Sequence, residues 1–297
     1  MLRVAMQVMF QLAPTPGRGV GWIIQRIVGA SLLLMLTGPA WADDDASPWD
    51  GNTHSAIRLI APSESGSAML RGGIEIRLAP RWSTYWRYPG DAGVPPRFDF
   101  SGSQNAASVT VLWPAPKVLS EAESRSIGYV DDVIFPLRIA PREQGKPVVL
   151  VLKADYAVCG QLCIPAAGAA TLTLPVSTST HEAALLRSEA RVPRPNAIGR
   201  GEGLAITAVS RQVSSGHSRV LVDIAAPQGA SVELFAEGPN PEWALPVPRA
   251  VPDPPPGLQR FAFDLEGLPP GASSEGAVIK LTAVCGDKAI EVDARLD

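Results

Sequence analysis

Short runs of apolar residues, many of them alternating with polar ones, recur along the chain from residue 56 onward. Alternation with a period of two predicts β-strands that bury one face. Proline, glycine and asparagine, which form turns, separate the runs. Short strands at such near-regular spacing predict an antiparallel β-sandwich. In the first half of the chain the predicted strands are residues 56–60, 73–78, 84–88, 108–113, 133–139, 148–152 and 170–174.

The strand pattern gives way to a helical one at residues 180–190, where Ser179 and Glu182 have the spacing of a capping box. A proline-rich linker is predicted at residues 192–196, after which the strand pattern resumes. The further predicted strands are residues 204–209, 219–224, 231–235, 259–265, 278–283 and 289–296. The pattern therefore predicts an all-β protein with a signal peptide and two sandwich domains joined by a helix and linker. The predicted boundaries are 1–42 for the signal peptide, 47–178 for the first sandwich, 179–199 for the helix and linker, and 200–297 for the second sandwich.

Two long pieces of the first predicted domain show no clear strand pattern, residues 89–103 and 114–132. Long loops are uncommon in compact domains and are often functional, so both pieces are candidates for a role at a site.

The composition agrees with a turn-rich β protein, with 29 prolines, 27 glycines and 46% apolar residues. The formal net charge is −3, and residues 1–42 contain three arginines and no acidic residue. Without this segment the charge becomes −6, so neither nucleic acid nor an anionic membrane surface is favoured as a partner.

The first 42 residues have the features of an export signal. Arg18 and Arg26 precede an apolar core at residues 27–36, and Ala40 and Ala42 are the small residues that a signal peptidase requires. An uncleaved anchor is the alternative, but Arg26 interrupts the apolar stretch, which must reach about 20 residues to span a membrane. We expect a cleaved signal, no membrane span thereafter, and a compartment in which cysteines can be oxidised.

The candidate chemistry lies at Cys159 and Cys163, which sit where one predicted strand gives way to the next. Three interpretations are open: a structural disulfide, part of a metal site, or a redox-active dithiol. A structural bond here would close a very small loop and stabilise the fold little. The chain has three histidines, His54, His181 and His217, none at a ligand-like spacing from the cysteines.

Four stretches resemble the periplasmic N-terminal domain of DsbD-type thiol:disulfide interchange proteins, closest to the ScsB-like branch. They are WSTYWRYPGDAGVPP (82–96), VLWPAP (111–116), GYVDD (128–132) and DYAVCGQLCIP (155–165). The resemblance covers about residues 50–180, and residues 237–243 resemble the second β domain of that branch more weakly.

The resemblance implies an immunoglobulin-like fold and a cysteine pair that passes electrons to periplasmic thioredoxin-like or disulfide isomerase proteins, without a cofactor or metal. It implies that Cys163 exchanges with partners and that Cys159 resolves the mixed disulfide. It also implies a cap over the sulfurs made by Ile127 and Tyr129, with Tyr85 and Trp86 lining the same patch. The chain would then act as a thiol-disulfide oxidoreductase of the protein-disulfide reductase type.

Full-length members of this family add a membrane domain and a thioredoxin-like domain, and we expect the present chain to stand alone without them. A separate membrane protein would then supply its electrons. The alternative is a non-catalytic, two-domain binding module with a structural disulfide. The third cysteine, Cys285, is predicted to be a buried, inert thiol. The alternative is that it forms an intermolecular disulfide.

We predict that the mature protein begins at or near Asp43, because Ala40 and Ala42 satisfy signal peptidase. The intact mass of exported protein should show the loss of residues 1–42. Recovery of the full-length chain in the membrane fraction would contradict this prediction.

Overall fold

The computed structural model describes residues 44–63, 66–121, 124–214, 217–265 and 267–297. The predicted signal peptide lies outside these residues. Within them, no helix has both the length and the apolar character that a membrane crossing requires.

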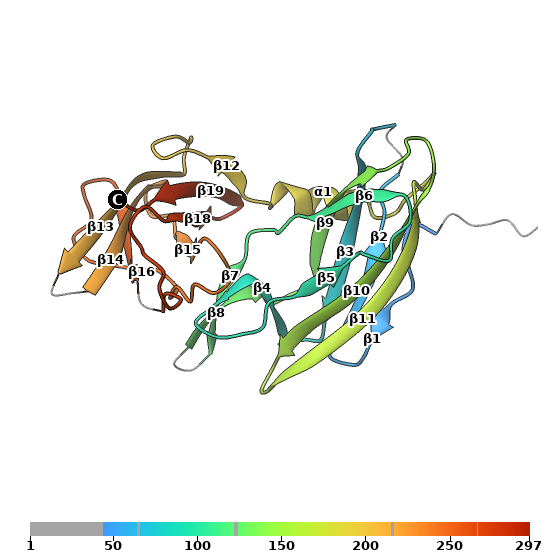
Figure 1. The fold of residues 1–297 in the computed structure, drawn as a ribbon, viewed down its shortest axis with the longest axis horizontal. Coiled ribbons are helices and arrows are strands. Elements are labelled where there is room, and N and C mark those ends of the chain that lie inside the picture. Colours follow the sequence, from blue (N-terminus) through green and yellow to red (C-terminus); the bar gives the residue numbers. More distant parts are fainter. Residues whose placement is uncertain (1–43, 64–65, 122–123, 215–216, 266) are drawn as a thin grey trace, which may run out of the picture. The chain divides into compact units, whose positions relative to one another are not determined.

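The first half of the described chain is a sandwich of two antiparallel sheets (Figure 1). One sheet has the strand order β1-β2-β3-β9-β6, and the other has the order β11-β10-β4-β8-β7, with β5 paired to β10. The first sheet consists of β1 (Asp50–Gly51), β2 (Ser55–Ile60), β3 (Leu70–Leu78), β6 (Ala106–Val111) and β9 (Val133–Pro141). The second consists of β4 (Ser83–Gly90), β5 (Arg97–Asp99), β7 (Lys117–Glu121), β8 (Ser124–Tyr129), β10 (Val148–Cys159) and β11 (Cys163–Leu174).

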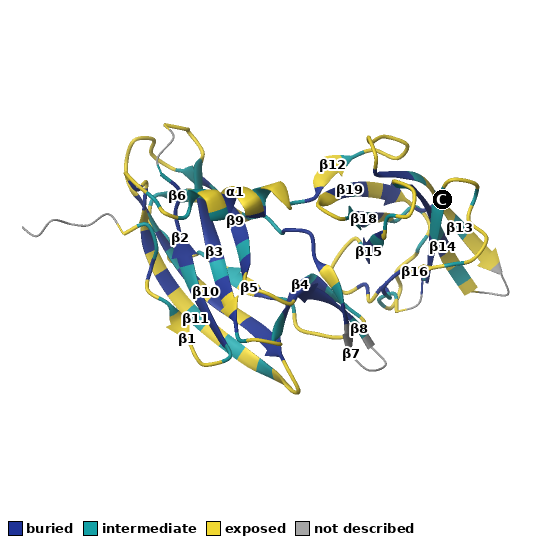
Figure 2. Cartoon of the chain, turned by 180° about the vertical axis from the view of Figure 1, so that it is seen from behind, coloured by how far each residue is buried: buried dark blue, intermediate teal, exposed yellow. Residues whose placement is uncertain are grey.

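The core of this sandwich is made by the inward-facing residues of both sheets, and the colours of Figure 2 show buried and exposed positions alternating along β10 and β11. Ile74, Ile76, Phe135 and Leu137 are fully buried. Each side chain of this kind contributes about 1.5–3 kcal/mol when it is removed from water. This period-two burial confirms the all-β prediction for the first domain.

The strands predicted at residues 148–152 and 170–174 are the far ends of one long hairpin. β10 and β11 are both 12 residues long and pair without interruption from Val148 and Leu174 to Cys159 and Cys163. The sequence pattern underestimated β11 because alanines and glycine between residues 165 and 170 weaken the apolar alternation. The two cysteines therefore form the last pair before the turn.

Residues 114–132, expected to be irregular, contain the hairpin β7–β8, which continues the second sheet beyond β4. Gly128 shows why this piece escaped the strand pattern. A Cβ atom at this position would lie 2.0 Å from the carbonyl oxygen of Thr84, so the close approach of β8 to β4 requires glycine. The pairing of Gly128 with Tyr85 is thus a packing requirement of the sheet.

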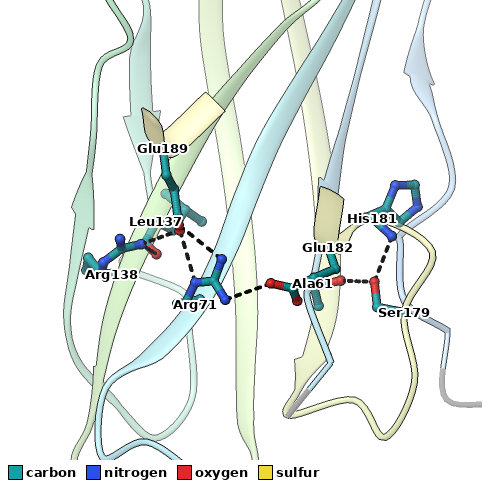
Figure 3. A network of polar contacts seen from close by, with 8 residues as sticks. All are labelled: Ala61, Arg71, Leu137, Arg138, Ser179, His181, Glu182 and Glu189. Carbon is teal, nitrogen blue, oxygen red and sulfur yellow. Dashed lines mark hydrogen bonds and ion pairs between the residues drawn. The ribbon is translucent and has the colours of Figure 1, made fainter. Parts of the chain in front are cut away.

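Helix α1 (Glu182–Ala190) packs on the first sandwich and is held there by ion pairs (Figure 3). Arg71 of β3 donates two hydrogen bonds to Glu189, both 3.0 Å long, and one of 3.0 Å to Glu182. Arg138 of β9 donates a further bond of 2.7 Å to Glu189. Burial acts to raise the pKa of Glu189, but the bonds from Arg71 and Arg138 outweigh it and lower the pKa below its usual value. Leu185 adds an apolar anchor, since it is fully buried.

The predicted capping box at Ser179 and Glu182 is wrong. The helix N-cap is His181, and no side chain caps it. The hydroxyl of Ser179 donates instead to the carbonyl of Ala61 at 2.6 Å and accepts the N–H of His181 at 2.9 Å (Figure 3). The Glu182 carboxylate is engaged by Arg71, so tertiary contacts have replaced the local motif.

The second half forms another sandwich, with one sheet ordered β12-β19-β18-β15 and one ordered β13-β14-β17-β16. Residues 194–196, predicted as part of the linker, form β12 and pair in parallel with β19. Cys285 ends β18 as a half-buried free thiol. The strands are β12 (Arg194–Asn196), β13 (Ala205–Ser214), β14 (His217–Ala225), β15 (Glu233–Glu237), β16 (Arg249–Ala250), β17 (Gln259–Asp264), β18 (Val278–Cys285) and β19 (Lys288–Arg295).

Strand β4 also makes hydrogen bonds to the second half of the chain. Tyr88 donates its hydroxyl to the carbonyls of Trp243 at 2.8 Å and Leu245 at 2.9 Å. The Arg87 guanidinium donates two hydrogen bonds to the Glu237 carboxylate in a bidentate pair, at 2.9 and 2.6 Å, and also forms an ion pair with Glu291. The strand that borders the cysteine hairpin is therefore held from several directions.

We predict that the two sandwiches fold separately, and that the first one requires α1. A fragment of residues 44–192 should unfold cooperatively in urea and be more stable than residues 44–178 by about 2 kcal/mol or more. The reason is the lost burial of Leu185 and the lost partners of Arg71.

Residues 194–297 provide the matching test of the second sandwich, since they keep β12. Equal stability of the two N-terminal fragments would contradict the role of α1. If neither half unfolds cooperatively, the two-domain interpretation is wrong.

Candidate functional site: the disulfide at the tip of a hairpin

The cysteine pair closes the β10–β11 hairpin as a disulfide. Cys159 and Cys163 are bonded to each other, and their Cα atoms are 4.0 Å apart. The turn between them is short, and the N–H of Gly160 donates to the carbonyl of Leu162 at 3.1 Å. The predicted strand–turn–strand setting therefore brings the two sulfurs together at one end of the sheet.

Strand β4 holds the end of this hairpin in place. Cys159 pairs with Ser83 and Val158 pairs with Thr84 in the sheet register. The Thr84 hydroxyl donates to the carbonyl of Ala157 at 2.9 Å, and the Ser83 hydroxyl donates to that of Cys159 at 3.3 Å. These bonds attach the disulfide to a central strand of the sandwich.

The two sulfur-bearing residues differ sharply in their exposure. Cys159 is only 2% exposed, whereas Cys163 lies at the exposed start of β11. Leu162, which precedes Cys163 in the turn, is 76% exposed. A reactant arriving from solvent therefore meets Cys163, with Cys159 behind it.

Tyr85 of β4 lies against both sulfurs. Its hydroxyl oxygen is 2.9 Å from the sulfur of Cys159 and 3.3 Å from that of Cys163. Disulfide sulfurs carry no proton, so the tyrosine hydroxyl must be the donor in these contacts. Tyr85, Ala157 and Cys159 form a small apolar cluster that is separate from the main core.

The loop between β4 and β5 covers the ring of Tyr85. A Cβ atom at Gly93 would lie 2.4 Å from that ring, so the loop can pass over it only with glycine there. The φ angle of Gly93 is 133°, which other residues rarely adopt. The loop is tied to β8, because the Ser126 hydroxyl donates to the carbonyl of Ala92 at 2.9 Å. Residues 89–103, noted for their irregular pattern, thus contribute to the site.

Of the residues that the resemblance assigns to the cap and lining, the structure brings Tyr85 to the sulfurs but places the others in the main core. Trp86 is fully buried and packs on Phe235, with ring centroids 5.8 Å apart. Ile127 and Tyr129 are also buried, and the Tyr129 hydroxyl donates to the carbonyl of Pro114 at 2.8 Å. Burial raises the pKa of Tyr129 well above its usual value, so it remains a protonated donor.

Strand alternation explains this division. Tyr85 and Trp86 are neighbours on one strand, so their side chains leave opposite faces of the sheet. Tyr129 pairs with Thr84 and therefore shares the inward face, whereas Gly128 pairs with Tyr85 on the outward face. Because Gly128 has no side chain, it leaves room for the Tyr85 ring on this face.

An open hollow of about 580 Å³ lies beside the hairpin tip. Trp82 lies in its wall and stacks on His54, with ring centroids 4.2 Å apart. Gly160 rests against the Trp82 ring, because a Cβ atom there would lie 2.9 Å from it. The lining residues are His54, Pro80, Arg81, Trp82, Gly160, Gln161, Leu162 and Ile164.

Sequence reasoning missed Gly93, Trp82 and His54 as neighbours of the disulfide. Trp82 and Gly93 lie within residues 82–96, which carried the family resemblance, so the resemblance could have indicated that they lie near the disulfide. His54 lies 28 positions before Trp82 and reaches it through the pairing of β2 with β3 and the turn that follows β3, which the sequence alone does not indicate. As regards metals, the described ranges hold no group of three or more His, Cys, Asp or Glu residues suited to a metal ion.

Fold and site together define a class: an immunoglobulin-like β-sandwich with a half-exposed disulfide at the tip of a hairpin. Residues 56–175 match the family described as "Thiol:disulfide interchange protein DsbD, N-terminal", as the resemblance predicted. The structure is similar to the "N-terminal periplasmic domain of ScsB from Proteus mirabilis". The TM-score is 0.65 and the identity 20%, over 85% of this chain and 98% of that one. No curated protein matches the chain. The family match and the disulfide support thiol-disulfide interchange as the general chemistry.

We predict that Gly93→Ala lowers the free energy of unfolding by about 2–3 kcal/mol, because the new methyl group must displace the loop or the Tyr85 ring. Gly145→Ala is the matched control. Gly145 also has a positive φ, of 75°, but nothing lies within 4 Å of the added atom, so this variant incurs backbone strain alone. Urea unfolding measures both, and an equal loss in the two variants would contradict close packing at Gly93.

Proposed function

We propose that the protein is a periplasmic thiol-disulfide interchange protein that passes electrons through the Cys159–Cys163 pair to partner proteins. The observation that carries the proposal is the contrast between the exposed Cys163 and the buried Cys159 within one disulfide. A pair that exchanges with other proteins needs one sulfur that they can reach and a second sulfur beside it that resolves the mixed disulfide.

The Cys159–Cys163 disulfide contributes little to the stability of the fold. β10 and β11 are paired along their whole length, and the hydroxyls of Ser83 and Thr84 hold the hairpin end on β4. A cross-link around so short a loop removes little entropy from the unfolded chain. These two facts favour exchange over the alternative of a binding module with a structural disulfide.

In the reducing direction, the thiolate of Cys163 attacks a partner disulfide and forms a mixed disulfide. The sulfur of Cys159 then attacks Cys163, which releases the reduced partner and restores the internal bond. The register pairing of Cys159 with Cys163 keeps the resolving sulfur next to the mixed disulfide. Electrons enter by the reverse sequence, from a thiol donor that attacks Cys163.

The partners that fit this chemistry are periplasmic thioredoxin-like or disulfide isomerase proteins, and the donor is a separate membrane protein. The matching family, which is one of thiol:disulfide interchange proteins, supports partners that exchange thiols and disulfides. The similar ScsB domain is described as periplasmic, which supports the location. Exchange between sulfurs requires no cofactor.

We expect Cys159→Ser to accumulate mixed disulfides with partners, because Cys163 can still attack but the resolving sulfur is gone. Cys163→Ser should accumulate few, since the remaining sulfur is buried. Cys285→Ser is the control and should accumulate none, because the wild-type pair still resolves its intermediates. Exported extracts separated without reductant, followed by mass spectrometry of the adducts, give the measurement.

The competing binding-module function has its own signature. If Cys159→Ser traps no partner and the wild-type pair also stays oxidised under a mild reductant, exchange is excluded. The disulfide would then be structural, and the domain would act by binding alone.

A further inference from the structure

The hydroxyl of Tyr85 is enclosed with the sulfur that solvent cannot reach. Tyr85 is 4% exposed and Cys159 is 2% exposed, and the oxygen and sulfur atoms are 2.9 Å apart. In a dry position a sulfur that becomes negative has no water to stabilise it, and burial therefore favours the thiol over the thiolate. A fixed hydroxyl donor at this distance offsets that effect.

We infer that Tyr85 is a catalytic residue of the exchange, because its hydroxyl donates a hydrogen bond to the Cys159 sulfur as that sulfur becomes a thiolate. The inference deepens the proposed function and rests on it. Tyr85 touches both reacting sulfurs, at 2.9 and 3.3 Å, so it acts on them directly.

The bonds and electrons of the step balance without any further reactant. The thiolate of a donor attacks the sulfur of Cys163, a donor–Cys163 bond forms, and the Cys163–Cys159 bond breaks. The electron pair of the broken bond goes to Cys159, which leaves as a thiolate. Tyr85 keeps its proton and donates the hydrogen bond. A second thiol of the donor then displaces Cys163, so the donor pair is oxidised and this pair is reduced.

The same bond acts in the opposite direction. When Cys163 is joined to a partner, Cys159 must attack it, and the attacking form is the thiolate. A hydroxyl that stabilises this thiolate increases the fraction of Cys159 that is ready to attack. Both the entry and the exit of electrons therefore depend on Tyr85.

The ring of Tyr85 has little freedom to leave this position. Gly93 passes so close to it that a Cβ atom there would be 2.4 Å away, and Gly128 opposite it presents no side chain. The hydroxyl is thus aimed at the sulfurs before the reaction begins, as a catalytic donor must be.

Charged groups around the hairpin end would also influence Cys159, but they are the same with or without the hydroxyl. Asp155 faces Arg97, and Lys153 faces Asp99, on the outward face of β10 and β5. Further charged or titratable groups on the neighbouring elements include Arg87 on β4, Asp91 in the covering loop, and His54 and Arg81 at the hollow. A variant that loses only the Tyr85 hydroxyl leaves all of them in place, so its effect reports that hydroxyl.

The test is Tyr85→Phe in the full mature chain, with two measurements. The first is the rate at which glutathione, a single thiol, opens the oxidised pair, and we expect it to fall about threefold to tenfold. The second is the titration of Cys159 in the Cys163→Ser background, followed by NMR of isotope-labelled cysteine. We expect the pH at which half of Cys159 is ionised to rise by about one unit or more.

Tyr156→Phe is the matched control. It removes a hydroxyl from β10 that pairs with Ser55 at 3.0 Å, on the other face of the same sheet and away from the sulfurs. We expect it to leave both measurements unchanged. If Tyr85→Phe does not fold, ortho-fluorotyrosine placed at position 85 should lower the Cys159 midpoint, because its more acidic hydroxyl is the stronger donor.

Unchanged rate and midpoint in a folded Tyr85→Phe protein would overturn the inference, as would equal changes in Tyr156→Phe. Neither result touches the proposed function, which depends on whether Cys159→Ser traps partners. If trapping fails but the Tyr85→Phe changes are found, the inference about the sulfur chemistry stands and the proposed relay falls.

Discussion

The alternation of side chains along β4 is the constraint on which the site depends. Neighbouring residues of a strand leave opposite faces of the sheet. Tyr85 therefore faces outward to the disulfide, while Trp86 faces inward to the core and contacts Phe235. At the start of the same strand, Ser83 and Thr84 bind the backbone of the hairpin end. A shift of β4 by one residue would replace the hydroxyl at the sulfurs with an indole and leave a polar residue in the core.

The hairpin tip explains how one disulfide has one reachable and one hidden sulfur. Cys159 ends a strand that is flanked by β11 and β4, whereas Cys163 begins a strand at the edge of the sheet. An edge strand has no neighbour to cover its first residue, so Cys163 meets solvent. The difference in exposure between the two sulfurs therefore follows from the positions of their strands in the sheet. The loop at Gly93 holds the Tyr85 ring in place.

Long-range ion pairs attach α1 to the first sandwich. The sequence indicated the helix at residues 180–190, but as part of a connection between domains. Arg71 and Arg138 bind its carboxylates, and Leu185 is fully buried beside Gly73 of β3, so α1 packs on the first sandwich. Arg71 and Arg138 lie 118 and 51 residues before Glu189 in the sequence, beyond the reach of local patterns. The capping box failed for the same reason, since Glu182 is drawn to Arg71.

The sequence by itself determined the all-β class, most of the strands, and the position of the cysteine pair at a strand end, because these follow from period-two patterns and turn residues that act locally. With the family resemblance it also indicated Tyr85. Only the tertiary structure decided that Tyr85, and not Trp86, Ile127 or Tyr129, lies at the sulfurs. Which face of a strand meets the site depends on its register with strands far away in the chain. That register is fixed by the packing of the two sheets, as are the exposure of Cys163 and the burial of Cys159.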